Sequence, residues 1–272
     1  MLAPLENVTD NALRELLHNH GADLTFTEMT MLNGIMKRNK KSLERINIQN
    51  NVPTQIQLSV LKETELMEFL KNFKPTKAFK GFNLNLGCPA PNIIKQGMGC
   101  GMIKRVSKVN RIVKIIKDAG YPCSIKMRLG MNWYEKKKKA YINLIKGVDA
   151  DFFIVHVRHG SEHYDASPNY ESLKECVETG KSIIANGDID TIEKVELVKS
   201  MGVKGVMIGR AAVKNPFLFE RLKGLEETSM EDLRKEYLKI FRKYKQESSY
   251  QENFLKRFDK QKLNILKEDV MG

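Results

Sequence analysis

The sequence predicts an α/β protein, a (β/α)8 TIM barrel followed by a short all-helical C-terminal extension. Three observations support this prediction. Short apolar or alternating runs of strand length recur eight times along the 272 residues. The segments between these runs are long enough to form helices. Several of those segments end in glycine after a polar turn, as expected where a helix leads into the next strand.

The expected strands follow one another at near-regular intervals. Their hydrophobic side chains alternate or run continuously, as in strands that are buried in a parallel sheet. The strands are expected at residues 1–5, 24–29, 54–59, 81–87, 123–129, 151–157, 181–187 and 205–210.

Helical periodicity is clearest at residues 109–120 and 191–202, where apolar residues recur every three or four positions. Alternating strands and helices would also fit an open, doubly wound sheet. That fold would place a G-x-G-x-x-G loop after the first strand, and residues 3–10, APLENVTD, do not contain one. The closed barrel is therefore the prediction.

The pattern changes from Lys223 onward. Residues 229–246 and 252–269 carry apolar side chains at helical intervals, and Ser229 with Asp232 forms an approximate helix-start signal. We therefore expect a barrel with the catalytic site at residues 1–221 and a small helical segment at residues 222–272.

Composition indicates a globular chain rather than a disordered or membrane protein. The chain is 42% hydrophobic and 29% charged, and its apolar runs are too short to cross a membrane. The first ten residues lack the pattern of a secretory signal. We expect a cytoplasmic monomer with no membrane or metal partner.

The four cysteines, at positions 88, 100, 123 and 176, include no C-x-x-C pair and do not form the framework of a disulfide-rich protein. Cys123 lies in an apolar run and is expected to be buried. Cys88 differs because it directly follows a strand and precedes two prolines and several glycines.

The chain carries a formal net charge of +13. Residues 222–272 hold 12 basic and 10 acidic side chains, so nearly all of the positive excess belongs to the expected barrel. Such a charge attracts polyanions such as nucleic acids, although a solvated lysine-rich surface would have the same composition.

Site candidates follow from the barrel, because its active site forms where the strands end and phosphate is held after strands seven and eight. Asn-Gly-Asp at the end of strand seven and Gly-Arg at the end of strand eight are each ordinary turns, but together they indicate a phosphate site. The candidates are Pro4, Leu5, Gln57, Asn85, Cys88, Lys126, Arg128, His156, Arg158, Asn186, Gly187, Asp188, Gly209 and Arg210.

Lys126 and His156 lie within apolar strands. Lys126 either extends to the strand's edge or faces an anionic partner, and His156 is expected to point inward, as part of the core or as a ligand contact. His156, His159 and His163 are not expected to bind a metal, because no carboxylate or cysteine completes the set.

Several segments resemble, in order and spacing, the tRNA-dihydrouridine synthases, a family of FMN-dependent barrels that reduce specific uridines in tRNA. The resemblance covers residues 1–221 and is most specific in its combination of motifs. These segments are LAPLENVTD, DLTFTEM, NLNLGCPAPNIIKQGMGCGMI, IKMRLG, IVHVRHG, IANGDI and GVMIGRAAVKNPFLF.

The resemblance implies FMN as the cofactor and NADPH or NADH as the reductant. Gln57, Lys126 and His156 would contact the flavin ring, which Pro4 and Leu5 would partly cover. The phosphate would lie at Asn186, Gly187, Gly209 and Arg210, and Asp188 is a further expected cofactor-binding residue. Leu5 and the NVTD stretch depart from the family's usual Met and Gly-Val-Thr-Asp, and neither change removes a group that the chemistry needs.

The resemblance also implies a role for Cys88. Hydride from reduced flavin would add to C6 of uracil, and Cys88 would donate the proton that C5 requires. Pro89 and Pro91 would hold the loop so that the sulfur faces the flavin. Cys100 is expected to be structural.

The implied substrate is tRNA, whose uridine must be flipped out to reach the pocket. Asn85, Arg128 and Arg158 are the expected substrate-binding residues, and Lys95 and residues 133–139, WYEKKKK, are further candidates for RNA contact. The C-terminal segment, expected to contact tRNA, is shorter than the family's usual helical domain. The target uridine therefore stays open. The sequence also does not decide between NADPH and NADH, and it does not fix the oligomeric state, for which a monomer is the expectation.

Two alternatives remain at this point. One is an FMN-dependent oxidoreductase of a free pyrimidine, similar to dihydroorotate dehydrogenases, which would not need a basic barrel. The other is a non-catalytic RNA-binding barrel. The joint presence of Cys88, Lys126, His156 and the phosphate-site residues argues against the second alternative.

Overall fold

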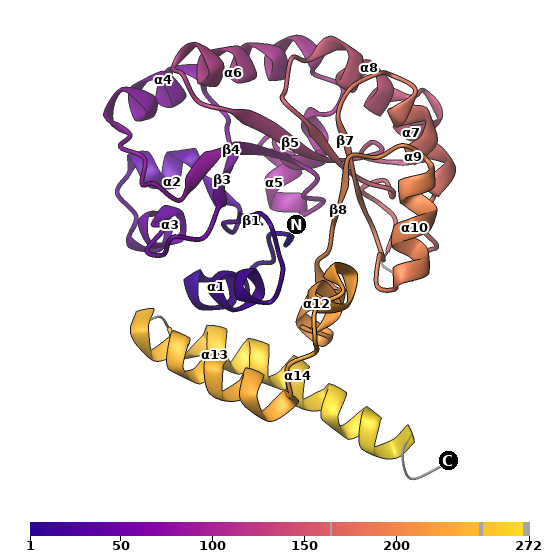
Figure 1. Ribbon diagram of the computed structural model, residues 1–272. Coiled ribbons are helices and arrows are strands. Elements are labelled where there is room, and N and C mark those ends of the chain that lie inside the picture. Colours follow the sequence, from indigo (N-terminus) through magenta and orange to yellow (C-terminus); the bar gives the residue numbers. More distant parts are fainter. Residues whose placement is uncertain (164, 245–246, 269–272) are drawn as a thin grey trace.

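A curled parallel sheet forms the centre of the molecule in the computed structural model, which describes residues 1–163, 165–244 and 247–268 (Figure 1). The strands are paired in the order β1-β3-β4-β5-β6-β7-β8, and β2 adds to β3. Their bounds are β1 Thr25–Phe26, β2 Thr30–Met31, β3 Thr54–Ser59, β4 Phe79–Leu86, β5 Cys123–Arg128, β6 Phe153–His156, β7 Ile183–Asn186 and β8 Gly205–Met207.

The N-terminal segment closes the ring between β8 and β1. Leu2 forms a parallel bridge to Ile208, and the backbone N–H groups of Leu2 and Ala3 donate to Leu24 (2.9 Å) and Ile208 (2.8 Å). Residues 1–5, predicted as a regular strand, therefore pair only around this bridge, because Pro4 has no N–H to continue the ladder and a turn follows at residues 6–8. The predicted strand at 24–29 is likewise short, with β1 covering two residues.

The helices outside the C-terminal segment are α1 Asn11–Asn19, α2 Leu32–Met36, α3 Lys40–Ile46, α4 Glu63–Asn72, α5 Pro91–Lys95, α6 Val106–Asp118, α7 Trp133–Lys137, α8 Ala140–Gly147, α9 Tyr170–Val177, α10 Ile192–Ser200 and α11 Arg210–Lys214. Among them, α4, α6, α8 and α10 lie on the outer side of the sheet, whereas α5 lies near its centre (Figure 1). A 3-10 turn, η1, spans Gly99–Met102. The helices predicted at 109–120 and 191–202 correspond to α6 and α10, so both predictions are confirmed.

The C-terminal residues form α12 Leu218–Lys223, α13 Met230–Tyr244 and α14 Ser248–Glu268, which confirms the helical extension. Parts of the predicted segment, residues 245–246 and 269–272, lie outside the described residues. Tyr237 and Phe254 of this segment share a buried cluster with Leu13 and Leu17 of α1. The segment is therefore packed against the N-terminal helix (Figure 1).

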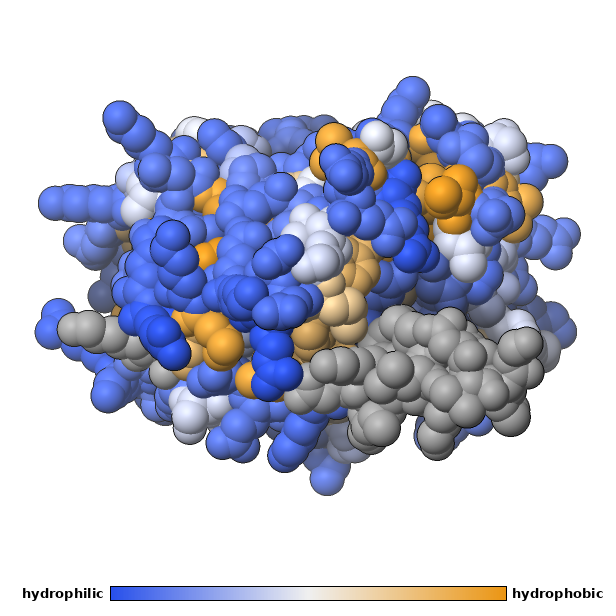
Figure 2. All heavy atoms as spheres, turned by 60° about the horizontal axis from the view of Figure 1, so that its bottom comes forward, coloured by the Kyte–Doolittle hydropathy of each residue, from blue (hydrophilic) through white to orange (hydrophobic). Residues whose placement is uncertain are grey.

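Apolar side chains fill two regions of the barrel. A large cluster lies between the sheet and helices such as α4, α6 and α8, and it includes Cys123, which is fully buried as predicted. A smaller cluster of Phe26, Ile154, Ile184 and Met207 lies together with Ala3. The face of the molecule shown in Figure 2 is largely hydrophilic, with apolar patches between the charged side chains. No helix in the described part of the chain is long and apolar enough to cross a membrane.

Candidate active site at the carboxyl ends of the strands

The strand register brings several predicted residues together at one end of the barrel. Asn85 of β4 lies opposite Lys126 of β5, Arg128 lies opposite His156 of β6, and His156 lies opposite Asn186 of β7. Because successive side chains point to opposite faces of a sheet, this spacing turns all five side chains to the same side. They face the mouth of the barrel.

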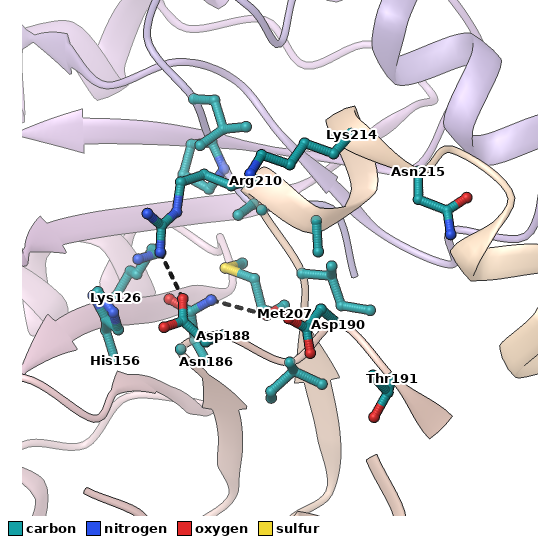
Figure 3. Close-up of a pocket in the computed structure, with 18 residues that line it drawn as sticks. Lys126, His156, Asn186, Asp188, Asp190, Thr191, Met207, Arg210, Lys214 and Asn215 are labelled. Atoms are coloured by element: carbon teal, nitrogen blue, oxygen red, sulfur yellow. Dashed lines mark hydrogen bonds and ion pairs between the residues drawn. The ribbon is translucent and has the colours of Figure 1, made fainter. Parts of the chain in front are cut away.

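Two cavities open at this mouth, with volumes of about 570 Å³ and 890 Å³. Pro4, Leu5, Lys126 and His156 line both, so the cavities are two lobes of one site. Figure 3 shows the first of them. The first lobe adds the predicted residues Asn186, Gly187, Asp188, Gly209 and Arg210. The second adds Gln57, Asn85, Cys88 and Arg128. We call them the glycine lobe and the cysteine lobe.

A chain of hydrogen-bonded amides supports the cysteine lobe from inside the barrel. Asn83 donates to Ser124 Oγ (2.7 Å), and Gln57 donates to Asn83 Oδ1 (2.7 Å). Asn85 in turn donates to Gln57 Oε1 (2.8 Å). Gln57, predicted to contact a flavin ring, is only 1% exposed, and both ends of its amide bond other side chains. In this structure, the amide of Gln57 orients the side chain of Asn85.

Asn85 holds the start of the cysteine loop. Its Oδ1 accepts hydrogen bonds from the backbone N–H groups of Gly87 (3.1 Å) and Cys88 (3.0 Å). The N–H of Cys100 donates to the Cys88 carbonyl (3.0 Å), and Pro91 begins α5 immediately beyond. The backbone of Cys88 is therefore bound on both sides, while its half-buried thiol faces the lobe.

Cys100, in contrast, is fully buried, and burial raises the pKa of its thiol to about 11. This placement agrees with the structural role expected for it.

Lys126 is a cation at the junction of the two lobes. Burial, with the nearby charge of Arg128 as a second cause, lowers the pKa of its ammonium to about 8. Within the described residues, no carboxylate forms an ion pair with Lys126. The sequence left open whether this lysine reaches solvent or faces an anion, and the structure places it where an anionic or electron-rich ligand would offset its burial.

His156 is neutral at physiological pH. Burial lowers its pKa to about 2, and the positive charges of Lys126, Arg128, Arg158 and Arg210 act in the same direction. Arg158 Nη1 donates to Nε2 of the ring (3.4 Å), so Nε2 is the acceptor and the ring proton belongs on Nδ1. A neutral imidazole of this kind can hydrogen-bond a ligand without adding charge.

Asp188 joins two arginines beside the glycine lobe. Its carboxylate accepts hydrogen bonds from Arg158 Nη2 (2.5 Å) and Arg210 Nη2 (2.6 Å). Burial acts to raise the pKa of Asp188, but these two arginines outweigh it and lower the pKa. Asp188 therefore holds the guanidinium of Arg210 at the lobe (Figure 3).

Arg158 lies behind the mouth rather than in it. It is 1% exposed and lines neither lobe, and its guanidinium also donates to the Ala166 carbonyl. The structure does not bring Arg158 into either lobe, because its donors bind Asp188 and the Ala166 carbonyl; its contact with substrate stays a prediction. No local sequence pattern indicates that Arg158 is buried, because the carboxylate that it binds, Asp188, lies 30 residues further along the chain.

The structure also brings to the site residues that sequence reasoning missed. Lys214 and Asn215 line the glycine lobe from α11 and its end, and Arg45 lines the cysteine lobe from α3. Lys214 lies four residues after Arg210, a spacing that puts both on one helix face and could have been read from the sequence. Arg45 gave no such signal. In the described part of the chain, no group of three His, Cys, Asp or Glu residues is placed to hold a metal ion.

Fold and site together define a (β/α)8 barrel with a cationic, glycine-lined ligand site at the carboxyl ends of its strands. Residues 1–270 match the family model for dihydrouridine synthase. The chain therefore belongs to the dihydrouridine synthase family.

Individual proteins agree with this assignment. The chain is 31% identical to a probable tRNA-dihydrouridine synthase of Staphylococcus aureus (strain COL), covering 96% of this chain and 82% of that protein. It is 30% identical to the probable tRNA-dihydrouridine synthase of Helicobacter pylori (strain ATCC 700392 / 26695), covering 82% and 69%. The old yellow enzyme homologue of Zymomonas mobilis has a similar fold, with a TM-score of 0.52 at 13% identity over 87% of this chain and 93% of that one.

Proposed function

We propose that this protein reduces uridines in tRNA to 5,6-dihydrouridine, with FMN as its cofactor and NADPH or NADH as the electron donor. Membership in the dihydrouridine synthase family supports the reaction, and its relatives' names support tRNA as the substrate. The observation that carries the proposal is the convergence of Cys88, Asn85, Lys126 and His156 on one cavity.

The residues of the glycine lobe fit FMN. The lobe's volume of about 570 Å³ is in the range of cofactor sites. A Cβ at Gly187 would come within 3.0 Å of the His156 ring, so only glycine leaves this wall open. Arg210 and Lys214 would hold the phosphate, and Lys126 would supply a positive charge next to the ring.

Bound FMN, once reduced, would supply the hydride that adds to C6 of the uracil ring. Cys88 then acts as the general acid: its S–H bond breaks, a C–H bond forms at C5, and the thiolate takes up a proton from solvent. The charge of Lys126 acts on Cys88, so it would stabilise the thiolate that remains. The fixed backbone of Cys88 keeps the sulfur in one place during the transfer.

Asn85 and Arg128 would orient the uracil beside Cys88. Asn85 is held by Gln57 and has its amide at the wall of the lobe, and Arg128 donates to the His159 carbonyl (2.8 Å) while lining the same lobe. Polar groups fixed in this way recognise the edge of a base. We assign Arg158 a positioning role, through Asp188 and His156.

The net positive charge of the chain supports a polyanionic substrate. With tRNA as that substrate, we expect the protein to act in the cytoplasm. The proposal includes two further predictions. The protein is a monomer, and its C-terminal helices contact the tRNA.

The test is mass spectrometry of nucleosides from unmodified tRNA incubated with the protein, FMN and NADPH or NADH. We expect dihydrouridine to form, and Cys88→Ala to lower its rate by about 10²- to 10⁴-fold, the usual contribution of a general acid. Cys88→Ala should keep its FMN, because the thiol is not part of the glycine lobe.

Cys100→Ala is the matched control, since it removes a thiol of the same loop that is buried outside the two lobes. Equal losses in the two variants would contradict the assignment of Cys88. Reduction of a free pyrimidine with no dihydrouridine in tRNA would replace the proposal with a small-molecule oxidoreductase.

A further inference from the structure

Two large aromatic side chains at successive positions of α7 are exposed. Trp133 is 60% exposed and Tyr134 is 61% exposed. Aromatic rings of this size normally bury most of their surface, and contact with a partner is a common reason for leaving them in water. Neither ring lines the glycine lobe or the cysteine lobe, so the site described above does not account for their exposure.

Lysines lie over both rings. Lys137 Nζ is 4.9 Å from the centroid of the Trp133 ring, and Lys138 Nζ is 5.8 Å from that of Tyr134. Within the described residues, neither Lys137 nor Lys138 forms an ion pair with a carboxylate. The surface is therefore aromatic and positively charged at once. We call Trp133, Tyr134, Lys137 and Lys138 the α7 platform.

The α7 platform is at the same end of the barrel as the mouth. It begins five residues after β5, whose last residue, Arg128, lines the cysteine lobe. Lys104, just beyond η1 of the cysteine loop, pairs with Glu135 of α7 (3.5 Å). Ser161, after β6, donates to the Met131 carbonyl (3.1 Å). The platform therefore stands next to the loops that border the mouth.

The short helix that carries the platform is held firmly. Asn132 caps it by accepting from the Glu135 N–H (3.0 Å), and the buried Glu135 accepts from the Met131 N–H (2.8 Å). Gly130 has φ +138, and a Cβ there would lie 2.9 Å from that of Glu135. A rigid support lowers the entropy lost when a ring stacks against a partner.

From this combination we propose that the α7 platform is a base-stacking site for unpaired nucleotides of the RNA, outside the catalytic pocket. The inference rests on the proposed function. Stacking on Trp133 and Tyr134 accepts any base, and Lys137 and Lys138 attract the phosphates on either side. Since a uridine must leave its stack to be reduced, a second holding point near the mouth would keep the opened strand in place.

Trp133 is the only tryptophan of the chain, so its fluorescence reports on the platform directly. The protein with its FMN is titrated with an unmodified tRNA transcript, a single-stranded oligoribonucleotide, a fully paired RNA duplex and heparin. We expect the first two to quench Trp133. Heparin, which has charge but no bases, should bind without that quenching, and the duplex should quench weakly.

Variants separate stacking from charge. We expect Trp133→Ala to raise the dissociation constant and the KM for tRNA roughly 5- to 100-fold, with FMN content unchanged, and Trp133→Phe to recover most of the loss. Lys137→Ala should reduce the salt dependence of binding by about one unit of slope. Leu197→Ala on α10, which removes a 46% exposed side chain away from the platform, is the matched control.

The platform and the enzymatic proposal can fail separately. Normal tRNA binding by Trp133→Ala, with dihydrouridine still formed by the wild type, would overturn the platform alone. Quenching by single-stranded RNA without dihydrouridine formation would keep the platform and reject the enzyme. Equal quenching by heparin and RNA would show that charge, and not stacking, changes the fluorescence.

Discussion

At the scale of single residues, the cations at the mouth of the barrel differ in whether they have a carboxylate partner. Asp188 satisfies two arginines, whereas Lys126 has no carboxylate against it among the described residues. The lowered pKa of Lys126 records the cost of burying that cation. A ligand that interacts with the ammonium would recover part of this cost on binding.

This difference predicts how FMN binding depends on pH. The pKa of Lys126 is about 8 without a ligand, so the ammonium loses its proton as the pH rises through 8. A ligand that prefers the charged form then binds more weakly, by up to about tenfold per pH unit. We expect the dissociation constant of FMN, measured by flavin fluorescence, to rise between pH 7 and 9.5.

Lys126→Arg is the matched variant, because arginine stays charged throughout this range. Its FMN affinity should be nearly constant over the same interval, whatever its absolute value. The role assigned to Lys126 would be wrong if the wild type and Lys126→Arg had parallel pH profiles.

At the scale of elements, the turn after β7 has a backbone that few residues adopt. Gly187 has φ +126 and Asp188 has φ +48. The Tyr170 hydroxyl of α9 donates to the Gly187 carbonyl (2.8 Å), and Asn186 donates to the Met207 carbonyl of β8 (2.8 Å). The turn is therefore fixed by both of its neighbours and keeps Asp188 directed at its arginines.

Gly187→Ala should damage the site more than the fold. Its Cβ would lie 3.0 Å from both the His156 ring and Val157 Cγ2, so the ring, which lines the lobe, would have to shift. We expect most bound FMN to be lost, as measured by flavin absorbance of the purified protein. The free energy of unfolding should fall by about 1–3 kcal/mol.

Gly180→Ala separates these two effects. Gly180 also has positive φ, +76, but a Cβ there would have no neighbour within 4 Å. This variant should lose stability through backbone strain alone and keep its FMN. Equal FMN loss in both variants would mean that Gly187 acts only through stability.

At the scale of the whole molecule, the C-terminal helices are joined to the mouth through a buried carboxylate. The Tyr250 hydroxyl of α14 donates to Glu28 Oε2 (2.7 Å), and Glu28 Oε1 accepts from the Val8 N–H (3.1 Å). Glu28 also pairs with Arg45 (3.0 Å), which lines the cysteine lobe. Through Tyr250, α14 therefore supports the site as well as extending the fold.

Tyr250→Phe tests this connection. The change removes one hydrogen bond to a buried carboxylate and should lower the free energy of unfolding by about 1–3 kcal/mol in urea denaturation. Glu28→Gln and the double variant complete the cycle. A coupling energy near zero between the two positions would show that the bond does not connect them.

Much of this architecture follows from short-range patterns. The apolar runs of β3 to β8, the periodicity of α6, α10 and α13, and the cysteine loop after β4 all depend on neighbours in sequence, and a strand or helix face repeats at a fixed interval. Once the strands are placed in order, parallel pairing brings their carboxyl ends together. Cys88, Lys126 and His156 could thus be assigned to one mouth from the sequence.

Only the tertiary structure decided how those residues are used. Arg158 is buried behind Asp188, Gln57 binds its neighbours Asn83 and Asn85, and Arg45 reaches the mouth from α3. Tyr250 meets Glu28 across 222 positions of sequence. The sequence alone determined the barrel, its order of strands and the cysteine at the site, because these depend on local periodicity. Partners and burial depend on contacts between distant segments, and no local pattern encodes them.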